Sequence, residues 1–182
     1  MGWVPINKLM EDYSILSSCV ESTITWLEGM PHVNNIIFIG IDFWGSIIAS
    51  QLSVRMNVCN MCLSTKKYDG SLSVYKDSLE KSIDQICSSI KLDSVVLVTD
   101  VISSGRTVHN IYAELNKILS DKHIEIGNWV VVSIIADIKK HSDMLLSNFA
   151  IIGTFCGSLK IPVIKSLDLP DEDILPPKHD LR

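Results

Sequence analysis

The chain has 182 residues, of which 47% are hydrophobic and 20% are charged, and its formal net charge is −5 at pH 7. This length fits one domain over residues 1–182, and the apolar content excludes a disordered chain, which could not bury enough surface to fold. The net negative charge and the small number of arginines exclude a protein-wide positive field. We therefore expect no nucleic-acid partner.

The five cysteines predict a reducing, cytoplasmic compartment. Their number is odd and they are scattered through apolar segments, which argues against a secreted disulfide framework. Cys59 and Cys62 form a single C-x-x-C, for which a zinc or redox pair competes with two buried thiols on a strand. The most membrane-like stretch, residues 36–54, contains Asp42, Gln51 and two glycines. A strand, a turn and a helix explain that stretch better than a membrane span, so no membrane association is expected.

Apolar spacing in the first half of the chain predicts two helices and two strands. Steps of three and four residues predict one helix over 9–27 and another that ends at about residue 56. Short apolar runs predict strands at 36–39 and 58–63. The polar stretch 64–78 predicts a mobile loop.

The second half continues this alternation of helices and strands. Its clearest elements are a helix over 79–90, a strand at 95–98, a helix over 108–119 and a strand at 129–136. Weaker patterns predict a short helix over 139–147, strands at 151–152 and 162–164, and an irregular tail at 168–182. The alternation predicts an α/β fold, with a mostly parallel central sheet and helices on both faces. Ligands of such sheets bind at the carboxyl ends of strands, where the strand order reverses.

The connection after the strand at 95–98 has the composition of an anion site. The strand brings Asp100 to its carboxyl end, where the carboxylate can bond a sugar diol or help to hold Mg²⁺. The five residues that follow are small, hydroxylated or basic: Ser103, Ser104, Gly105, Arg106 and Thr107. Free N–H groups and the dipole at the start of the next helix favour a bound anion, and Gly105 permits a positive φ. A phosphorylated sugar would satisfy both parts of this connection.

Residues 95–107 resemble the phosphoribosyl-pyrophosphate (PRPP) binding motif of type I phosphoribosyltransferases. That motif has four apolar residues, two acids, two apolar residues, a small polar pair, Gly, any residue, and Ser or Thr; twelve of the thirteen positions fit. Thr99 stands where most members carry the first acid, and Asp100 falls on the second. The resemblance implies that residues 103–107 bind the 5′-phosphate and that Asp100 is catalytic. The competing interpretation is an ordinary strand–turn–helix connection capped by a serine.

A second connection resembles the pyrophosphate loop of adenine phosphoribosyltransferases. It runs from the strand at 36–39 into the next helix and comprises Gly40, Ile41, Asp42, Phe43, Trp44 and Gly45. The resemblance implies that its backbone N–H groups bind pyrophosphate and that Asp42 orients the waters of Mg²⁺. Trp44 stands where the adenine enzymes place an arginine, and an indole cannot neutralise pyrophosphate. The competing interpretation is a tryptophan that packs in the core after a plain turn.

The resemblance also assigns roles to the rest of the chain. It implies a core over about 36–164, an N-terminal helix and hood within 1–35, and a homodimer. The loop at 64–78 takes the place of the family's flexible catalytic loop, and Lys66 and Lys67 take the place of its basic residues. The competing interpretation is a pair of solvated surface lysines.

Three functions are compatible with these residues. The resemblance implies a phosphoribosyltransferase that uses PRPP and Mg²⁺, transfers phosphoribosyl to a nitrogen acceptor such as a nucleobase, and releases pyrophosphate. The alternatives are a non-catalytic PRPP- or nucleotide-binding regulatory module and a scaffold that has lost ligand binding. Thr99 and Trp44 motivate the alternatives because both remove charge from the reaction centre.

Overall fold

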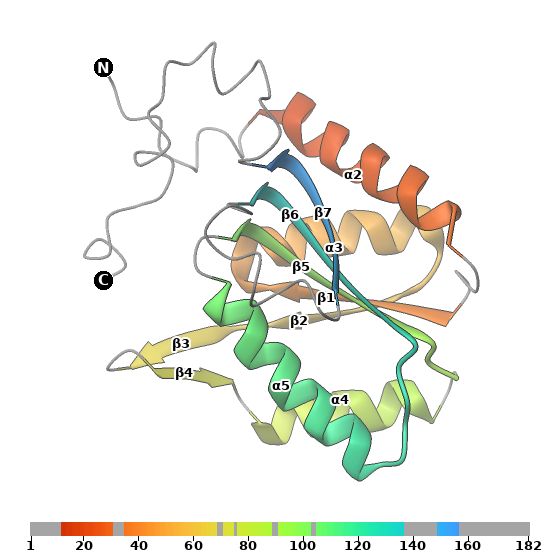
Figure 1. The fold of residues 1–182 in the computed structure, drawn as a ribbon, viewed down its shortest axis with the longest axis vertical. Helices are drawn as coiled ribbons and strands as arrows, with labels where there is room; N and C mark the ends of the chain where they lie inside the picture. Colours follow the sequence, from red (N-terminus) through yellow and green to blue (C-terminus); the bar gives the residue numbers. More distant parts are fainter. Residues whose placement is uncertain are drawn as a thin grey trace.

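The computed structural model describes residues 12–30, 35–68, 71–74, 76–88, 91–102, 105–136 and 149–156 (Figure 1). In chain order the elements are α2 (Tyr13–Glu28), β1 (Ile36–Ile41), α3 (Asp42–Met56), β2 (Cys59–Leu63), β3 (Thr65–Tyr68), β4 (Ser71–Val74), α4 (Lys76–Cys87), β5 (Ser94–Ile102), α5 (Arg106–Asp121), β6 (Asn128–Ala136) and β7 (Phe149–Cys156). The elements predicted at 139–147 and 162–164, and the tail at 168–182, lie outside the described residues.

The centre of the molecule is a five-stranded sheet in the order β2-β1-β5-β6-β7. All four neighbouring pairs are parallel, which confirms the predicted sheet. After β1 the chain adds β2 on one side, and it later places β5, β6 and β7 on the other. The strand order therefore reverses between β1 and β5.

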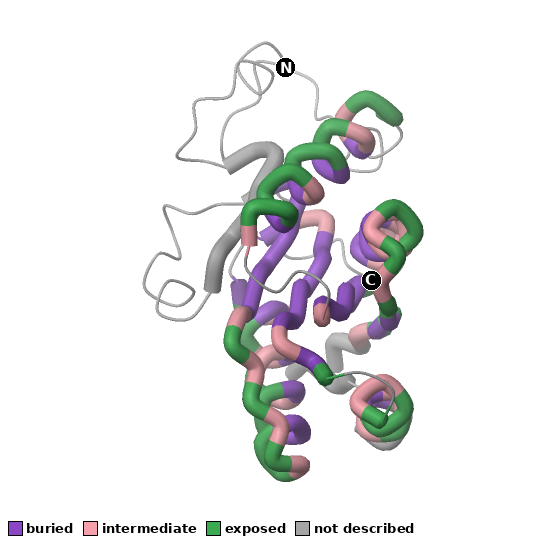
Figure 2. Tube along the Cα trace, turned by 90° about the vertical axis from the view of Figure 1, so that its right-hand side faces the viewer, coloured by how far each residue is buried: buried purple, intermediate pink, exposed green. Residues whose placement is uncertain are grey.

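Two hydrophobic cores cover the two faces of this sheet. On one face α2 and α3 pack over Phe38, Val96 and Val98, and on the other α4 and α5 pack over Val95 and Leu97. Figure 2 shows the buried strands between helices whose outer sides are exposed. Because successive residues of a strand face opposite sides, a continuous apolar run such as β5 contributes to both cores. The prediction of helices on both faces is confirmed.

Helix α2 lies within the segment predicted as an N-terminal helix and hood. It begins after Asp12, whose carboxylate accepts a hydrogen bond from the Ser14 N–H at 2.9 Å. Its apolar side, with Leu16, Val20 and Leu27, is buried in the same core as α3. Residues 12–28 are therefore part of the main α/β layer structure.

The prediction that residues 64–78 form a single loop is wrong. It contains an antiparallel hairpin, in which Thr65 pairs with Val74 and Tyr68 with Ser71, and the start of α4. This hairpin is a separate two-stranded sheet. Figure 1 shows it extending from the edge of the main sheet at which the strands end.

The cysteines of the C-x-x-C lie on β2, as the strand interpretation predicts, but the expectation that they are buried is wrong. Cys59 and Cys62 are both exposed and are free thiols. Residues three apart on a strand face opposite sides, so this strand does not direct the two sulfurs at one metal ion.

The separate loop predicted at 40–45 is absent, because β1 continues to Ile41 and α3 begins at Asp42. Gly40 lies inside the strand and Gly45 lies in the first turn of the helix. A Cβ on Gly40 would come within 2.5 Å of the Ser46 Cα, and one on Gly45 within 2.3 Å of the Val98 carbonyl oxygen. The two glycines therefore allow the start of α3 to touch the backbones of β1 and β5.

Replacing Gly45 with alanine should destabilise the fold, because the added methyl group would meet the backbone of a central strand. We expect Gly45→Ala to lower the free energy of unfolding by about 1–3 kcal/mol, the usual cost of overpacking. Urea denaturation measures the effect. Gly127→Ala is the matched control, since a Cβ there would meet the Asp93 carbonyl oxygen at an ordinary 3.6 Å. Equal midpoints for the two variants would contradict the close contact.

Candidate functional site at the reversal of strand order

The candidate site lies at the carboxyl ends of β1 and β5. Helix α3 leaves β1 over one face of the sheet and α5 follows β5 over the other. The two connections therefore diverge at the ends of β1 and β5, and open α/β sheets bind ligands in the crevice expected at such a place. In Figure 1 the ends of the strands, the start of α5 and the β3–β4 hairpin lie along the same side of the molecule.

Asp100 is the central carboxylate of this crevice. It is partly buried near the end of β5, and its Oδ1 accepts hydrogen bonds from the Val101 N–H at 2.8 Å and from the Thr99 hydroxyl at 3.3 Å. Burial raises the pKa of Asp100 above its ordinary value of 3.8, and the nearby negative charge of Asp42 raises it further, although these hydrogen bonds act in the opposite direction. Thr99, which replaces the first acid of the motif, is itself only 5% exposed.

Asp42 begins α3 on the opposite side of the crevice. Gly40 pairs with Val98 near the ends of β1 and β5, and Asp42, two residues after Gly40, is near enough for its charge to act on Asp100. Its φ of 56° is in the left-handed region, where non-glycine residues are uncommon. Its carboxylate accepts two hydrogen bonds from Thr65: Oδ1 from the N–H at 2.7 Å and Oδ2 from the hydroxyl at 2.8 Å. Asp42 therefore joins the start of α3 to the first residue of the hairpin.

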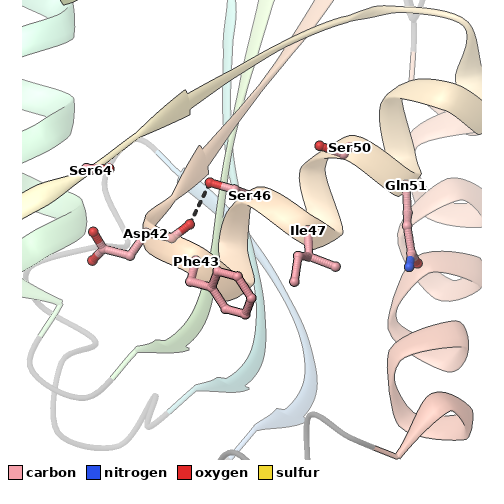
Figure 3. A pocket seen from close by; sticks show the side chains of 7 residues that line it. All are labelled: Asp42, Phe43, Ser46, Ile47, Ser50, Gln51 and Ser64. Carbon is pink, nitrogen blue, oxygen red and sulfur yellow. Dashed lines mark hydrogen bonds between the residues drawn. The ribbon is translucent and has the colours of Figure 1, made fainter.

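Asp42 also lines an open depression of about 610 Å³ along α3 (Figure 3). The lining residues are Asp42, Phe43, Ser46, Ile47, Ser50, Gln51 and Ser64. Within it the Ser46 hydroxyl donates a hydrogen bond to the Asp42 carbonyl oxygen at 2.5 Å. That bond steadies the backbone at the point where the strand becomes a helix.

The remaining residues of the predicted pyrophosphate loop have different surroundings. Phe43 is 70% exposed and contacts the Trp44 ring edge to face, with the ring centroids 5.1 Å apart. Trp44 packs against the core beneath α3, in agreement with the core-packing interpretation. Ile41 is buried at the end of β1. Only Asp42 of this segment therefore offers a charged group to the crevice.

The start of α5 forms the other wall. Gly105 has a φ of 64° and is the N-cap of the helix, and among the residues that the structure describes no side chain caps it. The first helical hydrogen bond runs from the His109 N–H to the Gly105 carbonyl oxygen at 2.9 Å. Arg106 and Thr107 lie in the first turn, whereas Ser103 and Ser104 lie outside the described residues. The helix dipole and the amides of this turn create a positive end beside Asp100.

Lys66 and Lys67 lie on β3, directly after Thr65, and pair with Ser73 and Leu72. Sequence reasoning connected these lysines to the site but missed Thr65, which links their strand to Asp42. In the described part of the chain no three acidic, histidine or cysteine side chains gather as metal ligands. No described helix is long and apolar enough to cross a membrane.

A scan against protein-family models finds no match, and a search of the curated proteins finds no significant relative. Solved structures do match. An adenine phosphoribosyltransferase from Trypanosoma brucei is 14% identical, covers 98% of this chain and 76% of its own, and has a TM-score of 0.59. A hypothetical protein from Neisseria gonorrhoeae with bound ppGpp is 14% identical over 91% of this chain and 93% of its own, with a TM-score of 0.54.

An adenine phosphoribosyltransferase from Thermoanaerobacter pseudethanolicus is also 14% identical, covers 80% of this chain and 83% of its own, and has a TM-score of 0.53. The likeness is in the fold, since the identities are far below the level at which activity is shared. The chain is thus an α/β protein with its crevice at a reversal of strand order. Its fold is that of the type I phosphoribosyltransferases, as the resemblance of residues 95–107 implied.

The electrostatics of the crevice predict that Asp100→Asn stabilises the fold at neutral pH. As the pH rises above about 4, the carboxyl ionises first in the unfolded chain, because its pKa is raised in the folded protein. Wild type therefore loses stability until the pH passes the raised value, whereas asparagine does not. The stability advantage of Asp100→Asn should grow between about pH 4 and pH 7.

Urea midpoints at these pH values measure the difference. Glu125→Gln, which removes an exposed carboxylate, controls for the loss of one charge. A gap between Asp100→Asn and wild type that shrinks as the pH rises would contradict the electrostatic account.

Proposed function

We propose that this protein binds PRPP and transfers its phosphoribosyl group to a nitrogen acceptor, with release of pyrophosphate. The observation that carries the proposal is the order of elements at the reversal of strand order: β5, with Asp100 near its carboxyl end, is followed by Gly105 at a positive φ and by the start of α5. A phosphorylated sugar needs an anion site and an acceptor for its hydroxyl groups side by side. The adenine phosphoribosyltransferase from Trypanosoma brucei, solved with AMP, pyrophosphate and ribose-5-phosphate, supports this choice among ligands.

In this proposal the 5′-phosphate binds to the connection 103–107. The first-turn amides of α5 donate to its oxygens, and the helix dipole favours its negative charge. Asp100 accepts hydrogen bonds from the ribose hydroxyls, which would replace the solvation that the carboxylate loses through burial. The sugar is thereby oriented with its anomeric carbon toward the space beside β1.

The cofactor in this proposal is Mg²⁺, carried by the diphosphate. Mg²⁺ is commonly held by one or two carboxylates together with substrate phosphates rather than by a cage of protein ligands. Asp42 and Asp100, at the ends of neighbouring strands and near enough for their charges to interact, suit that arrangement. When bound, Mg²⁺ would neutralise part of the negative charge on the leaving pyrophosphate.

The protein's own part in the reaction is positioning and charge stabilisation. An oxocarbenium-like transition state places growing negative charge on pyrophosphate, so donors and cations beside the leaving group lower the barrier. We assign that role to Lys66 and Lys67. The hairpin that carries them also limits access of water, which would otherwise hydrolyse the activated sugar.

A second candidate function is a non-catalytic PRPP- or nucleotide-binding module. Trp44 packs in the core and Thr99 is buried, so neither contributes charge where the reaction needs it. The structural neighbour from Neisseria gonorrhoeae with bound ppGpp supports a nucleotide as the ligand of such a module. PRPP binding without pyrophosphate release on any nucleobase would favour this function over the enzyme.

Gly105→Val should weaken PRPP binding by about tenfold or more. A β-branched residue at a positive φ costs about 1–2 kcal/mol. The backbone relieves this strain by a change of φ that moves the amides facing the phosphate. Titration calorimetry with PRPP and Mg²⁺, followed by a pyrophosphate-release assay with each nucleobase, measures binding and turnover.

Circular dichroism checks that the variant folds. Gly127→Ala, at the start of β6 and therefore far along the sheet from the crevice, should bind PRPP like wild type. Unchanged affinity in a folded Gly105→Val protein would overturn the anion site.

We further propose that the protein is a homodimer. Phe43 and Val54 are 70% and 81% exposed on α3, beside the edge strand β2. Burial of this apolar surface would favour association. Light scattering should report about twice the 20.3 kDa mass of one chain, and Val54→Gln should lower that value toward one chain. A monomer at micromolar concentration would contradict the dimer.

A further inference from the structure

The β3–β4 hairpin is a two-stranded sheet of its own. It pairs through only four register positions and is not joined to the five-stranded sheet. An isolated two-stranded hairpin is marginally stable in water. Its position therefore depends on what holds it at its base and along its side.

The contacts of the described residues attach the hairpin to both walls of the crevice. Strand β4 lies against α5. At the base, Thr65 donates both its N–H and its hydroxyl to the carboxylate of Asp42, at 2.7 and 2.8 Å. Hydrogen bonds to an ionised acceptor are the stronger kind. The hairpin is thus attached to the start of α3 at its base and to α5 along β4.

The backbone of Asp42 is adapted to this contact. Its left-handed φ of 56° lies at the junction where β1 turns into α3 without a loop, and its carbonyl oxygen is held by Ser46. Figure 3 shows its carboxylate directed away from α3, on the side of Ser64, which lies between β2 and β3. Asp42 is exposed and Thr65 is half-buried, so the hydrogen bonds between them attach the hairpin at the surface and add nothing to the buried core.

We propose that Asp42 is a positioning residue, which fixes the β3–β4 hairpin through Thr65 and thereby holds β3, the strand of Lys66 and Lys67, at the pyrophosphate side of the site. The role of the lysines rests on the proposed function. The attachment of the hairpin to Asp42 does not, and it can be tested on the ligand-free protein.

Four variants separate the attachment from the charge of Asp42. Asp42→Gly keeps the backbone conformation and removes the carboxylate, whereas Asp42→Asn tolerates the same φ and keeps an oxygen for the Thr65 N–H. Thr65→Val removes the hydroxyl donor and keeps the shape. Thr65→Ser keeps both donors.

Hydrogen exchange of the ligand-free protein is the first measurement. We expect peptides over residues 65–74 to exchange about tenfold faster or more in Asp42→Gly, and several-fold faster in Thr65→Val. Asp42→Asn and Thr65→Ser should stay close to wild type. The melting temperature should change little, because the hydrogen bonds between Asp42 and Thr65 lie at the surface. Equal exchange in wild type and Asp42→Gly would overturn the proposal.

Steady-state kinetics with PRPP is the second measurement. A loosened hairpin must be ordered at each binding event, so Asp42→Gly and Thr65→Val should raise KM for PRPP more than they lower kcat, and Thr65→Ser should restore the wild-type KM. If Asp42→Asn is as impaired as Asp42→Gly while Thr65→Val matches wild type, Asp42 acts through its charge alone and the positioning role is wrong. If wild type turns over no acceptor, the proposed function fails and the exchange data still decide the attachment.

Discussion

The close contact between the first turn of α3 and the backbones of β1 and β5 determines the geometry of the site. Gly40 and Gly45 permit it, because any Cβ at either position would meet backbone atoms. Because α3 packs so closely, no loop separates it from β1. The chain changes direction at Asp42, which takes the left-handed conformation. Burial is the main cause of the raised pKa of Asp100, and the same contact brings the Asp42 charge near enough to add to it. Packing of two glycines thus positions one of the two carboxylates of the crevice.

The elements buried on both sides could be predicted from the sequence. The apolar run of β5 has no alternative to a buried parallel strand, and the spacing of α5 directs Val108, Ile111 and Leu115 to one side. A positive φ could be predicted for Gly105, because it lies in the short connection between β5 and α5 and glycine adopts that conformation without strain. The structure gives it a φ of 64°. Local sequence and global fold agree here, so a single motif was sufficient to identify the fold.

The other wall of the crevice could not be predicted in the same way. Glycines suggest a loop, yet Gly40 and Gly45 lie in a strand and a helix because they permit close packing, which depends on contacts distant in sequence. The hairpin was missed because its strands have four residues each, β3 is mostly polar, and the alternation of Leu72 and Val74 with serines in β4 is too short to stand out. A local signal was present: Asp69 and Gly70 are the two residues between those strands in the sequence, and Asp-Gly is favoured in two-residue hairpin connections. Thr65 carried no signal, since its role exists only through Asp42.

The distribution of charge explains why residues 95–107 differ at position 99 from the PRPP-binding motif that they resemble. An acid at position 99 would be almost completely buried, beside the carboxylate of Asp100 and near that of Asp42, and like charges in such a place disfavour ionisation. Threonine instead donates a hydrogen bond to Asp100 and keeps the carboxylate oriented. Burial of the Asp100 carboxylate opposes its ionised form, and groups with such shifts cluster at ligand sites. Because Trp44 packs against the core, the proposed function assigns the positive charge beside a leaving pyrophosphate to Mg²⁺ and to the hairpin. In that proposal the β5–α5 connection binds the sugar phosphate, and the hairpin meets the charge of the leaving group.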